Sequence, residues 1–113
     1  MEIKNLQIKN HPMLKEMYDD AYYPDFLVDK IKLILLEMCH EIEHTTPADV
    51  PALLQITHAA TERINDLEDE FGEHDSELET VAREVMAADF GFIVQAYGFA
   101  GVDIEDVIAP RDW

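Results

Sequence analysis

Apolar residues recur along most of the chain at intervals of three and four, the spacing of one face of an α-helix. The clearest run covers residues 50–71, and a second run covers residues 25–44. In the first run the apolar face consists of Leu53, Thr57, Ala60, Ile64, Leu67 and Phe71. In the second it consists of Leu27, Ile31, Ile34, Met38 and Ile42. Each run therefore predicts a helix that buries one side.

A third long helix is predicted over residues 77–97. Ser76 and Glu79 are spaced as a capping box at its start, and Gly98 is a suitable stop at its end. We expect its buried face to consist of Leu78, Val81, Ala82, Val85, Ala88, Phe92 and Ala96.

Shorter elements are predicted on either side of the long helices. Residues 1–10 suggest a short strand or an irregular arm. A short helix is expected after Pro12 and is expected to end near Asp19. A last short helix is capped by Asp103 and ended by Pro110.

Together these elements predict an all-α fold in one domain that spans residues 1–113. The arrangement expected is a small up-and-down bundle of three long antiparallel helices with short helices at both ends. The chain has no apolar run long enough to span a bilayer, and its first ten residues lack the hydrophobic segment of a secretory signal. The single cysteine, Cys39, is expected to be a small buried residue, and a cytoplasmic location fits best.

Charge adds a second feature to this picture. The chain carries 25 acidic residues against 8 Lys and Arg, a net charge of −17. The excess lies in residues 33–113, where 19 acidic residues face three arginines, a net of −16. Such a field repels nucleic acid and anionic membranes and attracts basic proteins. An acidic surface also favours solubility, so this alternative stays open.

The acidic residues are densest in residues 62–79, which hold nine acids and only Arg63, a local net of −8. The predicted helix over residues 50–71 ends inside this segment, where its negative dipole end disfavours acids. We interpret the tolerated repulsion as a surface for a positive partner, with a merely solvated face as the alternative. The candidate residues are Glu68, Asp69, Glu70, Glu73, Asp75 and Glu77.

A tyrosine-rich segment, "MYDDAYYPDF" at residues 17–26, is a second candidate surface. Tyrosine combines apolar area with a polar tip and is enriched at interfaces. Alternatively the rings plug one end of the bundle, which we expect for Tyr18 and Phe26. The candidate partner-binding residues here are Asp19, Asp20, Tyr22 and Tyr23.

One further carboxylate, Asp89, lies beside the predicted inner face of the third long helix. A carboxylate in such a place needs a partner. We expect that partner to be Arg63 or Arg111.

A possible metal motif lies in the segment His40-Glu41-Ile42-Glu43-His44, which matches the H-E-x-x-H pattern of zinc peptidases. Two histidines one turn apart can reach one zinc ion, and the glutamate can act as a base. A third ligand is needed, and Pro47 occupies the position where the extended pattern has glycine. We expect His40 and His44 to be solvated surface residues and expect no cofactor. A metal-binding bundle or small metal-dependent hydrolase is the alternative.

Four stretches resemble an uncharacterised bacterial family of small acidic all-helical proteins, a domain of unknown function. They are "MYDDAYYPDFLVDKIK", "THAATERINDLEDEF", "DSELETVAREVMAADFGFI" and "IAPRDW". The resemblance covers nearly the whole chain and implies a bacterial origin and a helical fold. It implies no catalytic residues.

The functional hypothesis is therefore a non-enzymatic acidic protein that masks a basic surface of a protein partner. The partner would be a toxin or a nucleic-acid-binding protein, so the chain would act as an immunity or antitoxin-like inhibitor or as a mimic of nucleic-acid charge. No direct contact with nucleic acid or membrane is expected. A structural homodimer is a further alternative, suggested by the broad apolar face of the helix over residues 25–44.

Overall fold

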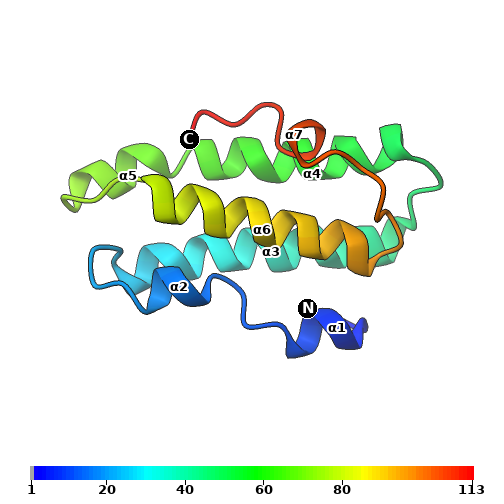
Figure 1. The fold of residues 1–113 in the computed structure, drawn as a ribbon, viewed down its shortest axis with the longest axis horizontal. Coiled ribbons are helices and arrows are strands. Elements are labelled where there is room, and N and C mark those ends of the chain that lie inside the picture. The colour runs from blue at the N-terminus through cyan, green and yellow to red at the C-terminus, as the bar shows by residue number, and fades with distance from the viewer. Residues whose placement is uncertain (1) are drawn as a thin grey trace.

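The computed structural model describes residues 2–113, which form α-helices and no strand (Figure 1). The predicted all-helical fold class is confirmed. The helices are α1 (Leu6–Asn10), α2 (Lys15–Tyr18), α3 (Asp25–Thr45), α4 (Val50–Asn65), α5 (Glu68–Glu73), α6 (Thr80–Ala96) and α7 (Ile104–Val107). None of these helices is both long and apolar enough to cross a membrane.

The predictions for α3 and for the start of α4 agree with the structure. Helix α3 begins directly after Pro24 and ends where Thr46 takes a left-handed conformation with φ of 44°. Helix α4 begins after Asp49, whose carboxylate accepts a hydrogen bond from the backbone N–H of Ala52 at 2.9 Å. Asp49 therefore caps the helix by satisfying one of its free N–H groups.

The helix predicted over residues 50–71 is divided in two at Asp66 and Leu67. Negative charge is unfavourable at the C-terminal end of a helix and favourable in the first turn. The division places Glu68, Asp69 and Glu70 in the first turn of α5 instead of the last turns of a longer α4. The fold thus relieves part of the expected repulsion, which corrects the interpretation of this segment, although Asp66 stays at the C-terminal end of α4 and Glu73 at that of α5.

The start of α6 also differs from the prediction, because the helix begins at Thr80 and not at residue 77. Ser76 does not form the capping box. Its side chain is buried and its hydroxyl donates instead to the carbonyl oxygen of Tyr22 at 2.9 Å. Glu79 occupies the N-cap position without a side-chain hydrogen bond.

The predicted buried face of α6 is confirmed only in part: Ala82 is buried, Leu78, Val85, Phe92 and Ala96 are partly buried against the core, and Val81 and Ala88 are exposed. The residues that α6 buries are Ala82, Met86, Asp89, Phe90, Ile93 and Val94. Val81, which was expected inside, is 42% exposed. Helix α6 carries apolar residues on two sides, so spacing alone does not distinguish the buried side from the exposed one.

The first residues do not form a strand. Residues 6–10 form helix α1, which is capped by the side chain of Asn5 accepting from the backbone N–H of Ile8 at 3.1 Å. Met1, the first residue of the predicted arm, lies outside the described residues. The short helix after Pro12 and the last short helix, with Asp103 as its N-cap, agree with the prediction.

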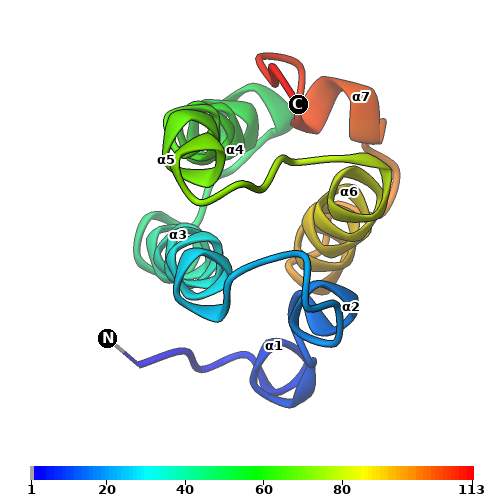
Figure 2. The same ribbon diagram turned by 90° about the vertical axis from the view of Figure 1, so that its left-hand side faces the viewer.

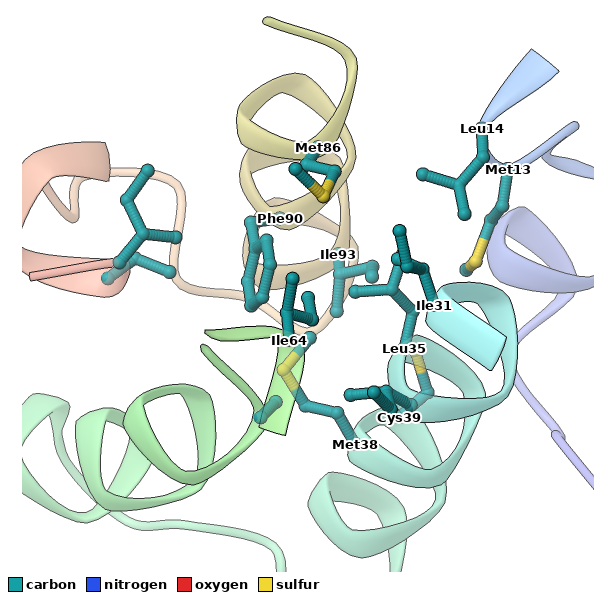
Figure 3. Close-up of a cluster of buried hydrophobic side chains, with 14 of the residues drawn as sticks. Met13, Leu14, Ile31, Leu35, Met38, Cys39, Ile64, Met86, Phe90 and Ile93 are labelled. Carbon is teal, nitrogen blue, oxygen red and sulfur yellow. The ribbon is translucent and has the colours of Figure 1, made fainter. Parts of the chain in front are cut away.

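Helices α3, α4 and α6 extend along the long axis of the molecule, but they are not equally close to one another (Figures 1 and 2). The helix pairs with the most extensive contact are α3 with α4, α2 with α6, and α6 with α7. The short helices thus flank α6 and complete the packing that three long helices were expected to provide alone. Side chains from α3, α4, α6 and residues 13–14 meet in one apolar core (Figure 3).

Candidate functional site

The two segments that the sequence singled out lie at the same end of the molecule. The loop between α2 and α3 and the segment from α5 to the start of α6 are both at the left of Figure 1, and Figure 2 looks onto that end. Two contacts join them: the Ser76 hydroxyl donates to the carbonyl oxygen of Tyr22, and the rings of Phe26 and His74 meet edge to face, 4.9 Å between centroids. We call residues 19–22 and 68–79 together the acidic end.

A surface depression of about 620 Å³ adjoins the acidic end, between α5, the start of α6 and the last two residues of the chain. Four of its carboxylates belong to the predicted acidic segment, and the chain's final residues add another. The lining carboxylates are Glu68, Asp69, Glu77, Glu79 and Asp112, with Arg83 as the one Lys or Arg side chain among the lining residues. The fold therefore concentrates negative charge from three separate segments around one concave surface.

Burial, and then this negative charge, raises the pKa of two groups in this region. Burial raises the pKa of Glu68, and the neighbouring carboxylates Asp112 and Asp69 raise it further. The pKa of Tyr22 is raised by burial first and then by Glu79 and Glu77. Both directions are those expected when negative charges gather, because each added negative charge disfavours another.

Two of the predicted acidic residues are already paired. The Glu70 carboxylate lies 2.5 Å from the ammonium group of Lys30, and the Asp19 carboxylate lies 2.6 Å from that of Lys15. A third, Asp20, accepts a hydrogen bond from the backbone N–H of Tyr22 at 3.0 Å. Among residues 2–113, no Lys or Arg pairs with Asp69, Glu73, Asp75 or Glu77. Glu68 and Glu79 are also absent from the ion pairs of the described residues, so six carboxylates of residues 68–79 carry unpaired charge.

The tyrosine segment needs two corrections. Tyr23 is only 3% exposed, and its hydroxyl oxygen accepts from the backbone N–H of Ala82 at 3.3 Å, so it belongs to the core. Phe26, expected to plug the bundle, is 46% exposed. Tyr18 is half-buried and donates to Asp29. Of the two tyrosines predicted to bind a partner, Tyr22 and Tyr23, only Tyr22 lies on the surface, at 40% exposure.

His40 and His44 are both exposed, and their rings are nearly parallel with centroids 6.4 Å apart. Within residues 2–113, no three His, Cys, Asp or Glu side chains are grouped to hold a metal ion. Within the motif Ile42 is buried and Glu43 is half-buried, and the Glu43 carboxylate accepts from the backbone N–H groups of Lys4 and Asn5 at 2.9 and 3.0 Å.

The hydroxyl of Tyr97 also donates to Glu43, at 2.5 Å. Burial acts to raise the pKa of Glu43, but the hydrogen bonds from Tyr97, Lys4 and Asn5 outweigh it, and the pKa lies below its usual value. Close by, burial raises the pKa of the Cys39 thiol to about 12. Glu43 therefore holds the backbone of Lys4 and Asn5 against the C-terminal end of α3 (Asp25–Thr45), which is a structural role.

Asp89 does not pair with Arg63 or Arg111. One carboxylate oxygen lies 2.7 Å from Nε2 of His11, and the other accepts from the backbone N–H of Leu14 at 2.7 Å. His11 also stacks on Phe92 with ring centroids 3.9 Å apart. Leu14 is left-handed, with φ of 59°, and its side chain is fully buried.

Sequence reasoning missed His11 because 78 positions separate it from Asp89 and no local pattern connects them.

The chain from residue 7 to residue 113 matches the model of a family described as "Family of unknown function (DUF5713)". The chain belongs to this family. No curated protein and no solved structure is similar enough to match. The resemblance to an uncharacterised domain is thereby confirmed, whereas the bacterial origin stays a prediction.

In this DUF5713 chain, the matched residues include the whole acidic end and the His11–Asp89 pair. Lys4 and Asn5, which donate to Glu43, precede the match. The family description names no activity, so the function of this DUF5713 member has to be argued from its surface and its chemistry.

Proposed function

We propose that the chain is a non-enzymatic binding protein whose acidic end masks a basic surface of a protein partner. One observation carries the proposal: the tyrosine segment and the acidic segment, far apart in sequence, are joined at one end through Ser76 and Tyr22. Asp69, Glu73, Asp75 and Glu77 are unpaired there among residues 2–113. Charge complementarity accelerates encounter with such a partner and excludes acidic competitors.

The partner is a protein with clustered Lys and Arg, such as a toxin or a nucleic-acid-binding protein. The chain then acts as an immunity or antitoxin-like inhibitor, or it imitates the charge of nucleic acid. We place this activity in the cytoplasm. The paired residues Glu70 and Asp19 and the buried Tyr23 take no part in binding, whereas Tyr22 supplies an aromatic contact beside the acids.

The test compares two variants of equal charge. The first, Asp69→Asn with Glu73→Gln and Glu77→Gln, neutralises the acidic end. The matched control, Glu2→Gln with Glu41→Gln and Asp106→Asn, removes three exposed negative charges elsewhere. Each variant is immobilised and used to capture proteins from the native host at low and high salt.

A basic protein captured by the wild type and the control, but not by the first variant, supports the proposal. Capture should weaken above about 0.5 M salt, where charges are screened within a few ångströms. Equal capture by both variants, or capture that high salt leaves unchanged, would refute recognition through the acidic end.

The metal-binding alternative rests on His40 and His44 alone. Zinc analysis of untagged protein checks it directly: bound zinc that is lost in His40→Ala would restore this alternative. The homodimer alternative is opposed by the net charge of −17, because two copies repel one another at low salt. Light scattering over a salt series tests it, since a dimer at every salt concentration would favour a structural role.

A further inference from the structure

One side of α6 is apolar and lies at the edge of the core, where other elements cover it only in part. Val81, Val85, Ala88 and Phe92 follow one another at spacings of four, three and four, and we call them the α6 stripe. Val81 is 42% exposed, Ala88 is exposed, and Val85 and Phe92 are half-buried. At 1.5 Å per residue the stripe is about 17 Å long, or three helical turns.

The α6 stripe lines a groove of about 550 Å³. Residues of the segment 11–16, which packs beside α6, line the same groove. The stacking of His11 on Phe92 and the bond from His11 to Asp89 fix that segment in place. Both walls of the groove are therefore held in place by specific contacts, so its shape does not depend on the rotamer of one mobile side chain.

Charged residues around the groove leave an excess of negative charge. Glu16 and Glu84 both line it, and neither has an ion-pair partner among residues 2–113. The one lysine, Lys15, lies 2.6 Å from the carboxylate of Asp19 and is already neutralised. The groove thus combines the apolar α6 stripe with negatively charged side chains, Glu16 and Glu84, along its edges.

We propose that this groove binds an amphipathic α-helix of a protein partner, with apolar residues at helical spacing and Lys or Arg beside them. Helices lay their apolar face into grooves of this kind, and the flanking charges select the sequence. A second copy of this chain is a poor occupant, because each copy carries −17. The site goes beyond the acidic end, whose depression shares no lining residue with the groove.

The probe is a fluorescent peptide of about 15 residues made of Leu and Lys, with Leu at helical spacing. A peptide of the same composition in scrambled order is its control. Binding is measured by fluorescence anisotropy at about 0.15 M salt. The variants are Val81→Glu in the groove and Val50→Glu outside it, since Val50 is similarly exposed at 38%. Ala88→Glu provides a second groove variant, and circular dichroism checks that each variant is folded.

The patterned peptide should bind the wild type and Val50→Glu equally, and both groove variants about tenfold more weakly, because each variant replaces apolar contact area in the groove with a carboxylate. The added glutamate attracts the lysines, so weaker binding cannot be due to charge. Equal binding by all variants, or equal binding of the scrambled peptide, would overturn the inference. So would a dimer at high salt that Val81→Glu abolishes, because a second copy would then fill the groove.

This experiment is separate from the test of the acidic end. Neutralising Asp69, Glu73 and Glu77 should leave the difference between Val81→Glu and Val50→Glu intact. Loss of that difference in the neutralised background would show that the peptide had bound the acidic end and not the groove.

Discussion

Replacing Asp89 with alanine should strongly destabilise the fold. The side chain of Asp89 is 8% exposed, and its two oxygens hold His11 and the backbone N–H of Leu14, each at 2.7 Å. A hydrogen bond to a charged group contributes about 1.5–3 kcal/mol. Part of this is offset because the carboxylate no longer has to be desolvated, so we expect Asp89→Ala to cost about 2–4 kcal/mol.

The more conservative change Asp89→Asn keeps an acceptor for the N–H of Leu14 and removes only the charge. It should cost about 1 kcal/mol. In a double-mutant cycle with His11→Ala, the coupling between His11 and Asp89 should be about 1–2 kcal/mol. Urea unfolding followed by circular dichroism gives these values, with the exposed Glu84→Ala on the same helix as control, expected within about 0.5 kcal/mol.

A cost below about 0.5 kcal/mol for Asp89→Ala would contradict this reasoning. It would mean that the N-terminal segment is not held by this carboxylate. If Asp89→Ala lowers the free energy of unfolding by the expected amount but the double-mutant cycle shows no coupling with His11, the whole effect comes from the hydrogen bond to the N–H of Leu14.

Three other properties follow from the structure. Because hydrogen bonds hold the pKa of Glu43 below its usual value, its ionised form stabilises the fold at neutral pH, and this contribution is lost as the pH falls through the folded-state pKa. Urea unfolding should thus find Glu43→Gln less stable than wild type at pH 7, with the difference beginning to shrink as the pH falls below the ordinary glutamate pKa of about 4.3; a difference independent of pH would contradict this. The Cys39 thiol, with a pKa of about 12, should resist a disulfide reagent at pH 8 until the protein unfolds, and rapid reaction of the native protein would show that it is accessible. Gly98 has φ of 94°, so Gly98→Ala should cost about 1–2 kcal/mol, whereas Gly101→Ala should be nearly neutral; equal melting temperatures for the two variants would refute the conformational argument.

Local signals explain the part of the fold that the sequence predicts well. The cap at Asp103 and the stop at Gly98 involve neighbours within a few residues, so they can be recognised without the fold. The apolar spacing of α3 identifies its buried side because its other side is largely polar. Such features depend on helix geometry alone.

The predictions are wrong where the local sequence is equally compatible with two arrangements and only the packing of the whole chain selects one of them. Helix α6 has apolar residues on two sides, and only the positions of α2 and α7 determine that Phe90 is buried while Val81 is exposed. Ser76 satisfies the capping pattern, yet its hydroxyl bonds Tyr22, 54 positions away. A pattern within one helix carries no information about either choice.

The acidic end was predicted in outline and corrected in detail. Composition identified the segment, but pairing depends on which lysines lie nearby: Lys30 reaches Glu70 across 40 positions, and Lys15 reaches Asp19 one turn away. The latter pair has helical spacing and was recognisable from the sequence. The partner of Asp89 was not, because His11 lies in a segment for which only a helix start was predicted.

The most direct test of recognition through the acidic end is chemical-shift mapping of the ¹⁵N-labelled protein with an oligolysine peptide. Such a peptide carries positive charge but no apolar face, so it does not compete for the α6 stripe. The largest shifts should fall on residues 68–79 and 19–22, and they should disappear as salt is raised to about 0.5 M. Shifts spread evenly over the acidic residues of the whole chain, or centred on another region, would contradict the account.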